Sequence, residues 1–123
     1  MFDYKKARKN MVDNLIRPAN VTDPKLLSAL GDVQREKFLP SNLASLSYSE
    51  TDFLIQNYRL LVSPWLLAKM LQFLDLNSVD NVLSLAAGYG YSCALMSSLA
   101  NFVVAVETKD LAQEAQARLI ENG

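Results

Sequence analysis

The chain of 123 residues contains no histidine and a single cysteine. Histidine is the most common general base and metal ligand in proteins, and cysteines supply disulfides and many zinc sites. The sequence therefore excludes histidine-dependent catalysis, an intrachain disulfide and a cysteine-rich zinc site, and we expect no metal centre. Any chemistry has to rely on carboxylates, hydroxyls, amides or the reactivity of a cofactor.

The sequence also lacks an excess of charge of either sign and a long apolar run. Its 12 basic and 13 acidic residues give a net charge of −1, so we expect neither a nucleic-acid nor an anionic-membrane partner. The longest apolar region, residues 60–74, is interrupted by polar residues and a proline, and residues 1–17 are too charged for a signal peptide. We therefore predict no membrane span and a cytoplasmic location.

Half of the residues are hydrophobic, which is enough for the core of one ordinary domain. Apolar residues first recur at helical spacing, whereas residues 82–85 and 102–106 are continuous apolar runs, typical of strands in a parallel sheet covered on both faces. We therefore predict an N-terminal helical region, residues 1–75, and a β-α-β-α region, residues 76–123. Helices are predicted at residues 4–16, 24–30, 64–74, 91–100 and 109–121.

Four local features refine this prediction. Gly31 is expected to end the second helix, and residues 122–123 are expected to end the last one. Residues 35–49 are expected to be a loop with one helical turn. The basic cluster at residues 5–9 is expected to form a solvated helix face.

The clearest functional motif lies between the two predicted strands. Residues 82–85 lead into a small-residue loop with Gly88 and Gly90, and the second strand ends at Glu107, about twenty residues further on. This order is typical of a nucleotide-binding βαβ unit. Small residues let backbone N–H groups approach an anionic group, and a carboxylate can accept hydrogen bonds from both ribose hydroxyls.

The spacing of the glycines favours one type of cofactor. A dinucleotide fingerprint places Cys93 where a third glycine should allow close packing of helix and sheet, so the fit is poor. Starting at Ala86 instead gives small-x-Gly-x-Gly, the arrangement of S-adenosylmethionine-dependent methyltransferases. We favour S-adenosylmethionine, with a dinucleotide and a purely structural turn as alternatives. For Cys93 itself we predict a buried, inert thiol.

Several segments together resemble the N-terminal half of the protein-L-isoaspartate O-methyltransferases. They are residues 11–13, 21–23, 33–40, 63–64 and 82–91, and the Arg-Glu-x-Phe-x-Pro segment within residues 35–40 is the most specific. The resemblance implies an α/β fold, in which an N-terminal helical layer precedes the first β-α-β-α part of a Rossmann-like, S-adenosylmethionine-binding sheet. It also implies methyl transfer to the carboxyl groups of isoaspartyl residues in damaged proteins.

The resemblance further implies which residues contact the cofactor: Ser84, Ala86, Gly88, Gly90 and Glu107. Two of these positions depart from the family pattern, because an acid is usual where Ser84 stands and a glycine where Ala86 stands. The missing acid weakens an expected cofactor contact. Ala86 is tolerated without strain only if the backbone there does not need a positive φ.

The predicted catalytic position departs from the family pattern as well. The family usually carries Thr-Ile-Ser-x-Pro, with the serine at the reacting centre. Aligned on Pro64, this chain has Val62 at the serine position and Ser63 one residue later. In an extended segment such a shift reverses the direction of a side chain. Ser63 is therefore a catalytic candidate whose structural alternative is a cap for the helix that Pro64 opens.

The predicted sheet is incomplete, because two parallel strands alone leave both edges unpaired. Three interpretations stay open: a fragment of an ordinary enzyme, a natural truncation with a non-catalytic binding role, or a homodimer that pairs its sheet edges. The functional prediction is an isoaspartyl methyltransferase fragment that is inactive alone and whose substrate is an isoaspartyl protein or peptide. The alternative is a non-catalytic interaction protein derived from the methyltransferase scaffold.

Overall fold

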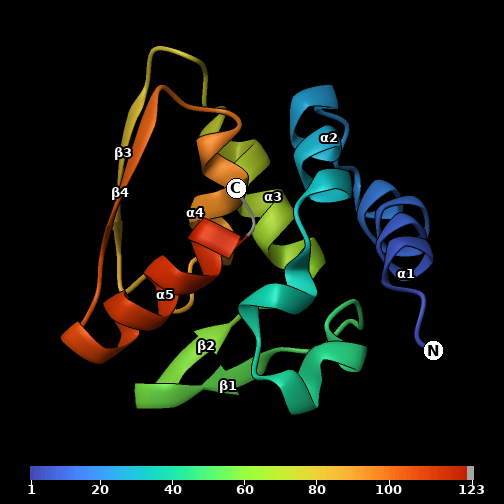
Figure 1. Ribbon diagram of the computed structural model, residues 1–123. Coiled ribbons are helices and arrows are strands. Elements are labelled where there is room, and N and C mark those ends of the chain that lie inside the picture. Colours follow the sequence, from blue (N-terminus) through green and yellow to red (C-terminus); the bar gives the residue numbers. More distant parts are fainter. Residues whose placement is uncertain (122–123) are drawn as a thin grey trace.

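The computed structural model describes residues 1–121 (Figure 1). The α-helices of this part of the chain are α1 (Tyr4–Met11), α2 (Pro24–Asp32), α3 (Pro64–Leu74), α4 (Tyr91–Ser97) and α5 (Lys109–Glu121). Its strands are β1 (Phe53–Ile55), β2 (Arg59–Leu61), β3 (Asn81–Leu85) and β4 (Phe102–Val106). In Figure 1 the β3–β4 ribbon flanks one side of the molecule, α1 and α2 lie at the opposite side, and α3 and α4 lie between them.

The parallel strand pair predicted from the two apolar runs is confirmed. β3 and β4 pair in parallel, with Leu83 opposite Val104 and Leu85 opposite Val106. The connection through α4 is the crossover that a parallel pair needs, because its strands cannot be joined by a tight turn. Both strands therefore end at the same edge, which brings the loop after β3 next to the residue after β4.

The second helix continues past its predicted end. Gly31 lies inside α2, which runs to Asp32 and ends where Val33 adopts an extended conformation. A glycine inside a helix lowers the stability of the helix without breaking it, so its presence alone does not mark a boundary. The predicted start is confirmed, because the Asp23 side chain accepts hydrogen bonds from the first backbone N–H groups of α2.

The other predicted helices are present: α3 has both of its predicted ends, α5 begins at its predicted first residue, and the first and fourth helices differ at their ends. The first, predicted over residues 4–16, changes at Val12 into a π-helical turn. α4 ends at Ser97 and not at residue 100, because the chain turns there to enter β4. The expected end of the last helix at residues 122–123 lies outside the described residues.

Residues 53–61 form a β-hairpin that the sequence pattern does not predict. β1 and β2 pair antiparallel across a tight turn, in which Asn57 and Tyr58 both have a φ of +58°. Strands of three residues are too short to show a clear alternation of polar and apolar residues. Residues Arg35–Phe38 and Ser41–Leu46 form two 3₁₀ turns, where the sequence predicts one helical turn.

One hydrophobic cluster joins the N-terminal helices to α3, α4 and α5. Its fully buried members include Ile16, Leu26, Leu30, Phe38, Leu95 and Leu111. The cluster contains residues from both regions that the sequence pattern distinguishes. The helical region is therefore packed directly against the β-α-β-α region, and its loops are held near the loop that follows β3.

Arg8 corrects the expectation that the basic cluster at residues 5–9 is a solvated helix face. The Arg8 guanidinium is buried, and it donates hydrogen bonds to the Gly31 carbonyl at 2.8 Å and to the Tyr48 hydroxyl at 3.1 Å. It also lies 3.6 Å from the Glu36 carboxylate, to which the Tyr48 hydroxyl donates in turn. A buried charged group needs such partners. These contacts attach α1 to the end of α2 and to Glu36 and Tyr48.

The β3–β4 pair is covered on one face only, which corrects the expectation of a sheet covered on both faces. Val82 and Val103 are partly buried against the core. The large side chains of the uncovered face are exposed: Leu83, Leu85, Phe102, Val104 and Val106. Leu85, for example, is 70% exposed. The continuous apolar runs thus reflect two apolar faces, of which the described residues bury one.

Candidate functional site

The loop between β3 and α4 turns sharply through three residues with positive φ. The φ angles are +56° at Ala86, +63° at Gly88 and +99° at Gly90. Glycine adopts this region freely, whereas the Cβ of alanine is crowded there. Ala86 is therefore strained, because the loop does need a positive φ at this position.

Two other elements pack directly on this loop. A Cβ atom at Gly88 would lie 3.1 Å from the Cδ1 atom of Ile55 on the β1–β2 hairpin. A Cβ atom at Gly90 would lie 3.2 Å from the side chain of Leu119 on α5. The glycines therefore allow the hairpin and α5 to approach the loop from different sides. A cavity of about 90 Å³ remains beside the loop, less than the roughly 300 Å³ of a small-molecule site.

Glu107 follows β4 and meets the loop as the motif predicts. Its Oε2 atom accepts the Gly88 N–H at 2.8 Å, and its Oε1 atom accepts its neighbour Thr108's N–H at 2.8 Å. The glycine loop and the acid, 19 residues apart in the sequence, are therefore in direct contact. The Glu107 side chain is 2% exposed.

Arg59 at the start of β2 binds the same carboxylate. Its Nε and Nη2 atoms donate to the two oxygens of Glu107 at 2.8 and 2.7 Å. This two-pronged ion pair, helped by the backbone N–H groups of Gly88 and Thr108, lowers the pKa of Glu107 to about 2 despite burial. The sequence offers no signal for Arg59, because the pairing partner lies 48 residues away.

α5 is held over the loop by a second arginine. The Arg118 guanidinium lies 4.2 Å from the centre of the Tyr89 ring and donates to the carbonyls of Lys37 and Leu39 at 2.8 Å. The Tyr89 hydroxyl donates to the Gln56 side chain of the hairpin turn at 3.0 Å. The loop, the hairpin and α5 therefore form one connected unit.

Neither of the two predicted serines, Ser84 and Ser63, belongs to this connected unit. Ser84 is half-buried on β3 and interacts with the Cys93 thiol, whose pKa is raised by burial. The prediction of a buried Cys93 is confirmed. Ser63 is buried just before α3, and its side chain makes no capping hydrogen bond. Val62 lines the small cavity beside the loop and Ser63 does not, as expected for neighbours in an extended segment.

The Arg-Glu-x-Phe-x-Pro segment contributes a buried arginine next to the loop. Arg35 is fully buried and donates to the carbonyls of Ser47 at 2.6 Å and Val62 at 3.0 Å. Its guanidinium also lies 4.8 Å from the centre of the Tyr91 ring, at the start of α4. Arg35 thus ties the segment before α3 to the end of the glycine loop.

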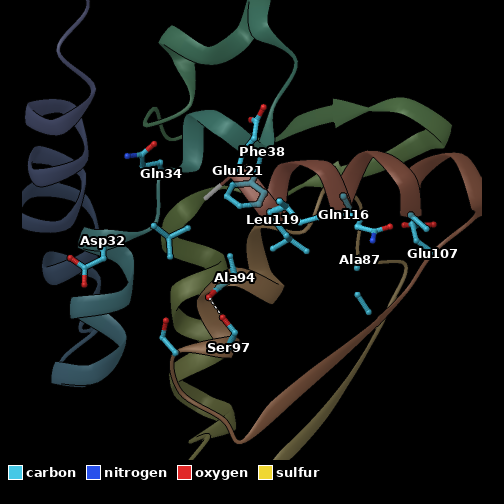
Figure 2. A pocket seen from close by; sticks show the side chains of 16 residues that line it. Asp32, Gln34, Phe38, Ala87, Ala94, Ser97, Glu107, Gln116, Leu119 and Glu121 are labelled. Atoms are coloured by element: carbon cyan, nitrogen blue, oxygen red, sulfur yellow. Dashed lines mark hydrogen bonds between the residues drawn. The ribbon is translucent and has the colours of Figure 1, made fainter. Parts of the chain in front are cut away.

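A larger cavity of about 830 Å³ lies between α2, α4 and α5. Figure 2 shows Ala87 and Glu107 at one end of this cavity and Asp32 and Gln34 at the other. Much of the lining consists of small side chains of α4 and α5. Glu107 lines this cavity but Gly88 and Gly90 do not, and the Glu107 oxygens are already hydrogen-bonded to Arg59 and the backbone. Residues 1–121 contain no cluster of acids, cysteine and histidine that could hold a metal ion.

Comparisons with protein sequences identify related chains. A family model described as protein-L-isoaspartate(D-aspartate) O-methyltransferase matches residues 6–123. The protein-L-isoaspartate O-methyltransferase of Rhodopseudomonas palustris is 37% identical over 114 residues, which is 92% of this chain and 52% of the relative. That of Protochlamydia amoebophila is 35% identical over 114 residues, 92% of this chain and 54% of the relative. The chain therefore spans about half the length of these curated relatives.

Solved structures show the same fold. A protein-L-isoaspartate O-methyltransferase superposes with a TM-score of 0.78 at 23% identity, over 93% of this chain and 38% of that one. A putative protein-L-isoaspartate O-methyltransferase from Plasmodium falciparum, in complex with S-adenosyl-L-homocysteine, also gives a TM-score of 0.78, at 19% identity. It matches 94% of this chain and 56% of its own. The predicted fold class, a helical layer before a partial Rossmann-like sheet, is confirmed.

No described helix combines the length and hydropathy that a membrane span requires.

Proposed function

Because the chain belongs to the protein-L-isoaspartate(D-aspartate) O-methyltransferase family, we propose that it binds S-adenosylmethionine through Gly88, Gly90 and Glu107. The proposal rests on one observation above all: the carboxylate after β4 lies directly against the backbone of the glycine loop, with 2.8 Å between the Gly88 nitrogen and Oε2. The family membership adds the reaction class, and the S-adenosyl-L-homocysteine held by the Plasmodium falciparum protein supports the cofactor class.

The donor and acceptor groups of the site fit such a cofactor. Glu107 is ionised at neutral pH, because its pKa is lowered to about 2, and its two oxygens can accept hydrogen bonds from two ribose hydroxyls. Ala86, Gly88 and Gly90 keep the loop backbone free of bulky side chains. The space at the loop fits less well, because Arg59 holds the carboxylate and the adjoining cavity is about 90 Å³.

We propose that the whole protein transfers a methyl group to the carboxyl group of an isoaspartyl residue in a protein or peptide. The cofactor supplies a methyl group on a positively charged sulfur, which is reactive without further activation. The acceptor carboxylate is already ionised at neutral pH, so the transfer needs no general base. A catalytic role for Ser63 and a cofactor contact from Ser84 stay predictions.

A second candidate function is that of a non-catalytic interaction protein built on the same scaffold. Two observations favour it. Arg59 is hydrogen-bonded to both oxygens of the Glu107 carboxylate, which the cofactor would need. Val62 stands where the family pattern has a serine. In this function the Arg59–Glu107 pair is a permanent structural bond.

Calorimetric titration with S-adenosylhomocysteine tests the proposed cofactor site. Because Arg59 holds the same carboxylate, the comparison is made in the Arg59→Gln background, where we expect Glu107→Gln to weaken binding by about tenfold or more, since hydrogen bonds to a charged group contribute about 1.5–3 kcal/mol. Glu50→Gln is the matched control, since Glu50 is exposed and far from the loop in sequence. Equal affinities of Arg59→Gln with and without Glu107→Gln would reject the assignment, and no binding by any variant would favour the second candidate.

A methyl-transfer assay with an isoaspartyl peptide tests the reaction. We expect residues 1–123 alone to give no methylation above background, because two paired strands and their helices leave the acceptor unpositioned beside the cofactor. Cofactor-dependent methylation by a monomeric preparation of this chain would contradict that expectation.

A further inference from the structure

The contact between Arg59 and Glu107 has the hydrogen-bonding pattern of a bound ligand. A guanidinium presents two nearly parallel N–H donors, and here each donor reaches a different carboxylate oxygen, at 2.8 and 2.7 Å. A vicinal diol, such as that of a ribose, presents two O–H donors to a carboxylate in the same way. Arg59 therefore stands in the position that the proposed function assigns to the ribose.

The hairpin that carries Arg59 is tied to the site at its turn. The Asn57 amide donates to the Thr108 hydroxyl at 3.3 Å, and Gln56 accepts the Tyr89 hydroxyl at 3.0 Å. The turn also contains two residues other than glycine with positive φ, Asn57 and Tyr58. The Arg59 side chain is 29% exposed and its neighbour Asn57 is exposed, whereas the Glu107 side chain is only 2% exposed. The ion pair can therefore open on the Arg59 side without moving β4.

We propose that Arg59 is an internal competitor for the ribose hydroxyls of the cofactor and that it sets the affinity of the site by holding Glu107 when no cofactor is bound. The proposal rests on the proposed function, in which Glu107 binds the ribose. Binding then requires an exchange: Arg59 leaves both carboxylate oxygens, and the two hydroxyls take its place while Gly88 keeps its hydrogen bond to Oε2.

The apparent affinity equals the intrinsic affinity of the open site multiplied by the fraction of molecules in which Arg59 has released Glu107. Arg59→Gln removes the positive charge and the two-pronged geometry. We expect this variant to bind S-adenosylhomocysteine, and also adenosine, about tenfold more tightly than the wild type. Arg17→Gln is the matched control, because it removes an exposed arginine from an ion pair elsewhere, and it should leave both affinities unchanged.

A double-mutant cycle separates competition from a general effect of charge. When Glu107 is replaced by Gln, there is no carboxylate to hold, so adding Arg59→Gln should no longer change the affinity. An equal gain in both backgrounds would mean that Arg59 repels the ligand without competing for Glu107, and would overturn the proposal. If Glu107→Gln has no effect in the Arg59→Gln background, the ribose assignment and the competition both fail.

Nuclear magnetic resonance of the wild type provides a second measurement that does not depend on a variant folding. The Nε–H proton of Arg59 is hydrogen-bonded to Glu107, so its signal should be protected from exchange in the free protein and should lose that protection when S-adenosylhomocysteine is added. A saturated complex with an unchanged Arg59 signal would overturn the competition and leave the proposed function standing. Failure of Arg59→Gln and wild type alike to bind would overturn both.

Discussion

At the scale of single residues, Ala86 is the clearest source of strain in the site. Its φ of +56° belongs to the left-handed region, which costs an L-residue with a Cβ about 1–2 kcal/mol. Ala86→Gly should therefore raise the free energy of unfolding by about 0.5–1 kcal/mol, after subtracting the larger entropy of glycine in the unfolded chain. Urea denaturation measures the change.

Ala87→Gly is the control for this prediction. Ala87 has no positive φ, so the same substitution there adds only unfolded-state entropy and should lower the free energy of unfolding by about 0.5 kcal/mol. A destabilised Ala86→Gly variant would show that the loop tolerates alanine without strain.

Glu107 makes the stability of the protein depend on pH. Its pKa falls from an ordinary 4.5 to about 2 in the folded chain, chiefly through Arg59. A carboxyl with a lowered pKa stabilises the fold fully above its unfolded pKa, and this contribution is lost as the pH falls through the folded pKa. The stability advantage of wild type over Glu107→Gln should shrink by about 3 kcal/mol between about pH 6 and about pH 2.

Urea denaturation of both proteins across this pH range measures the advantage, and the Glu50→Gln variant provides the reference for general acid effects. A constant difference between wild type and Glu107→Gln would contradict the ion pair with Arg59.

The residues of the site differ in how well the sequence predicts them. Glu107 and the glycines could be predicted, because their roles depend on local backbone geometry and on the common edge of two parallel strands. Arg59 could not, because its contact requires a hairpin whose strands have three residues each. Arg35 lies in the segment most specific to the family, yet its burial becomes visible only when Ser47 and Val62 are placed around it.

At the scale of elements, α1 is held by one buried charged group. Arg8 donates to Gly31 and Tyr48 and neutralises Glu36. Arg8→Ala would leave a buried carboxylate without its cation, so it should lower the free energy of unfolding by about 3–5 kcal/mol. Lys9→Ala, one residue along the same helix, removes a side chain that is 76% exposed and should cost less than about 0.5 kcal/mol.

Thermal or urea unfolding of the two variants tests the contrast. Similar losses in both would mean that helix propensity, and not the buried pair, accounts for the effect. The sequence predicts the helix itself from its apolar stripe. It does not reveal that one of four neighbouring basic residues turns inward, because the acid and tyrosine that receive Arg8 lie 28 and 40 residues further on.

At the scale of the whole molecule, the uncovered face of the β3–β4 pair gathers five exposed large apolar side chains on two adjacent strands. We expect it to drive self-association, so that light scattering gives a mass above 13.7 kDa. Replacing the opposed residues Leu83 and Val104 by lysine and glutamate should reduce the mass to that of one chain. Phe73→Lys is the control, because Phe73 is 91% exposed on α3 and lies on another element.

A monomeric wild type at high concentration would contradict this prediction. The sequence predicts both strands and their parallel pairing, because continuous apolar runs need no partner to be recognised. It cannot predict which face is covered in residues 1–121, since an apolar run looks the same whether one face or two faces are buried.

The ties between the hairpin and the glycine loop also bear on how fast the protein folds. They join residues 33, 48 and 51 positions apart, and closing such long loops costs entropy that no short-range contact returns. We therefore expect these ties to be absent from the rate-limiting transition state and to form after the helices and the β3–β4 pair. Breaking them would accelerate unfolding while leaving the folding rate nearly unchanged. The site is thus the last part of the molecule to assemble and the first to come apart.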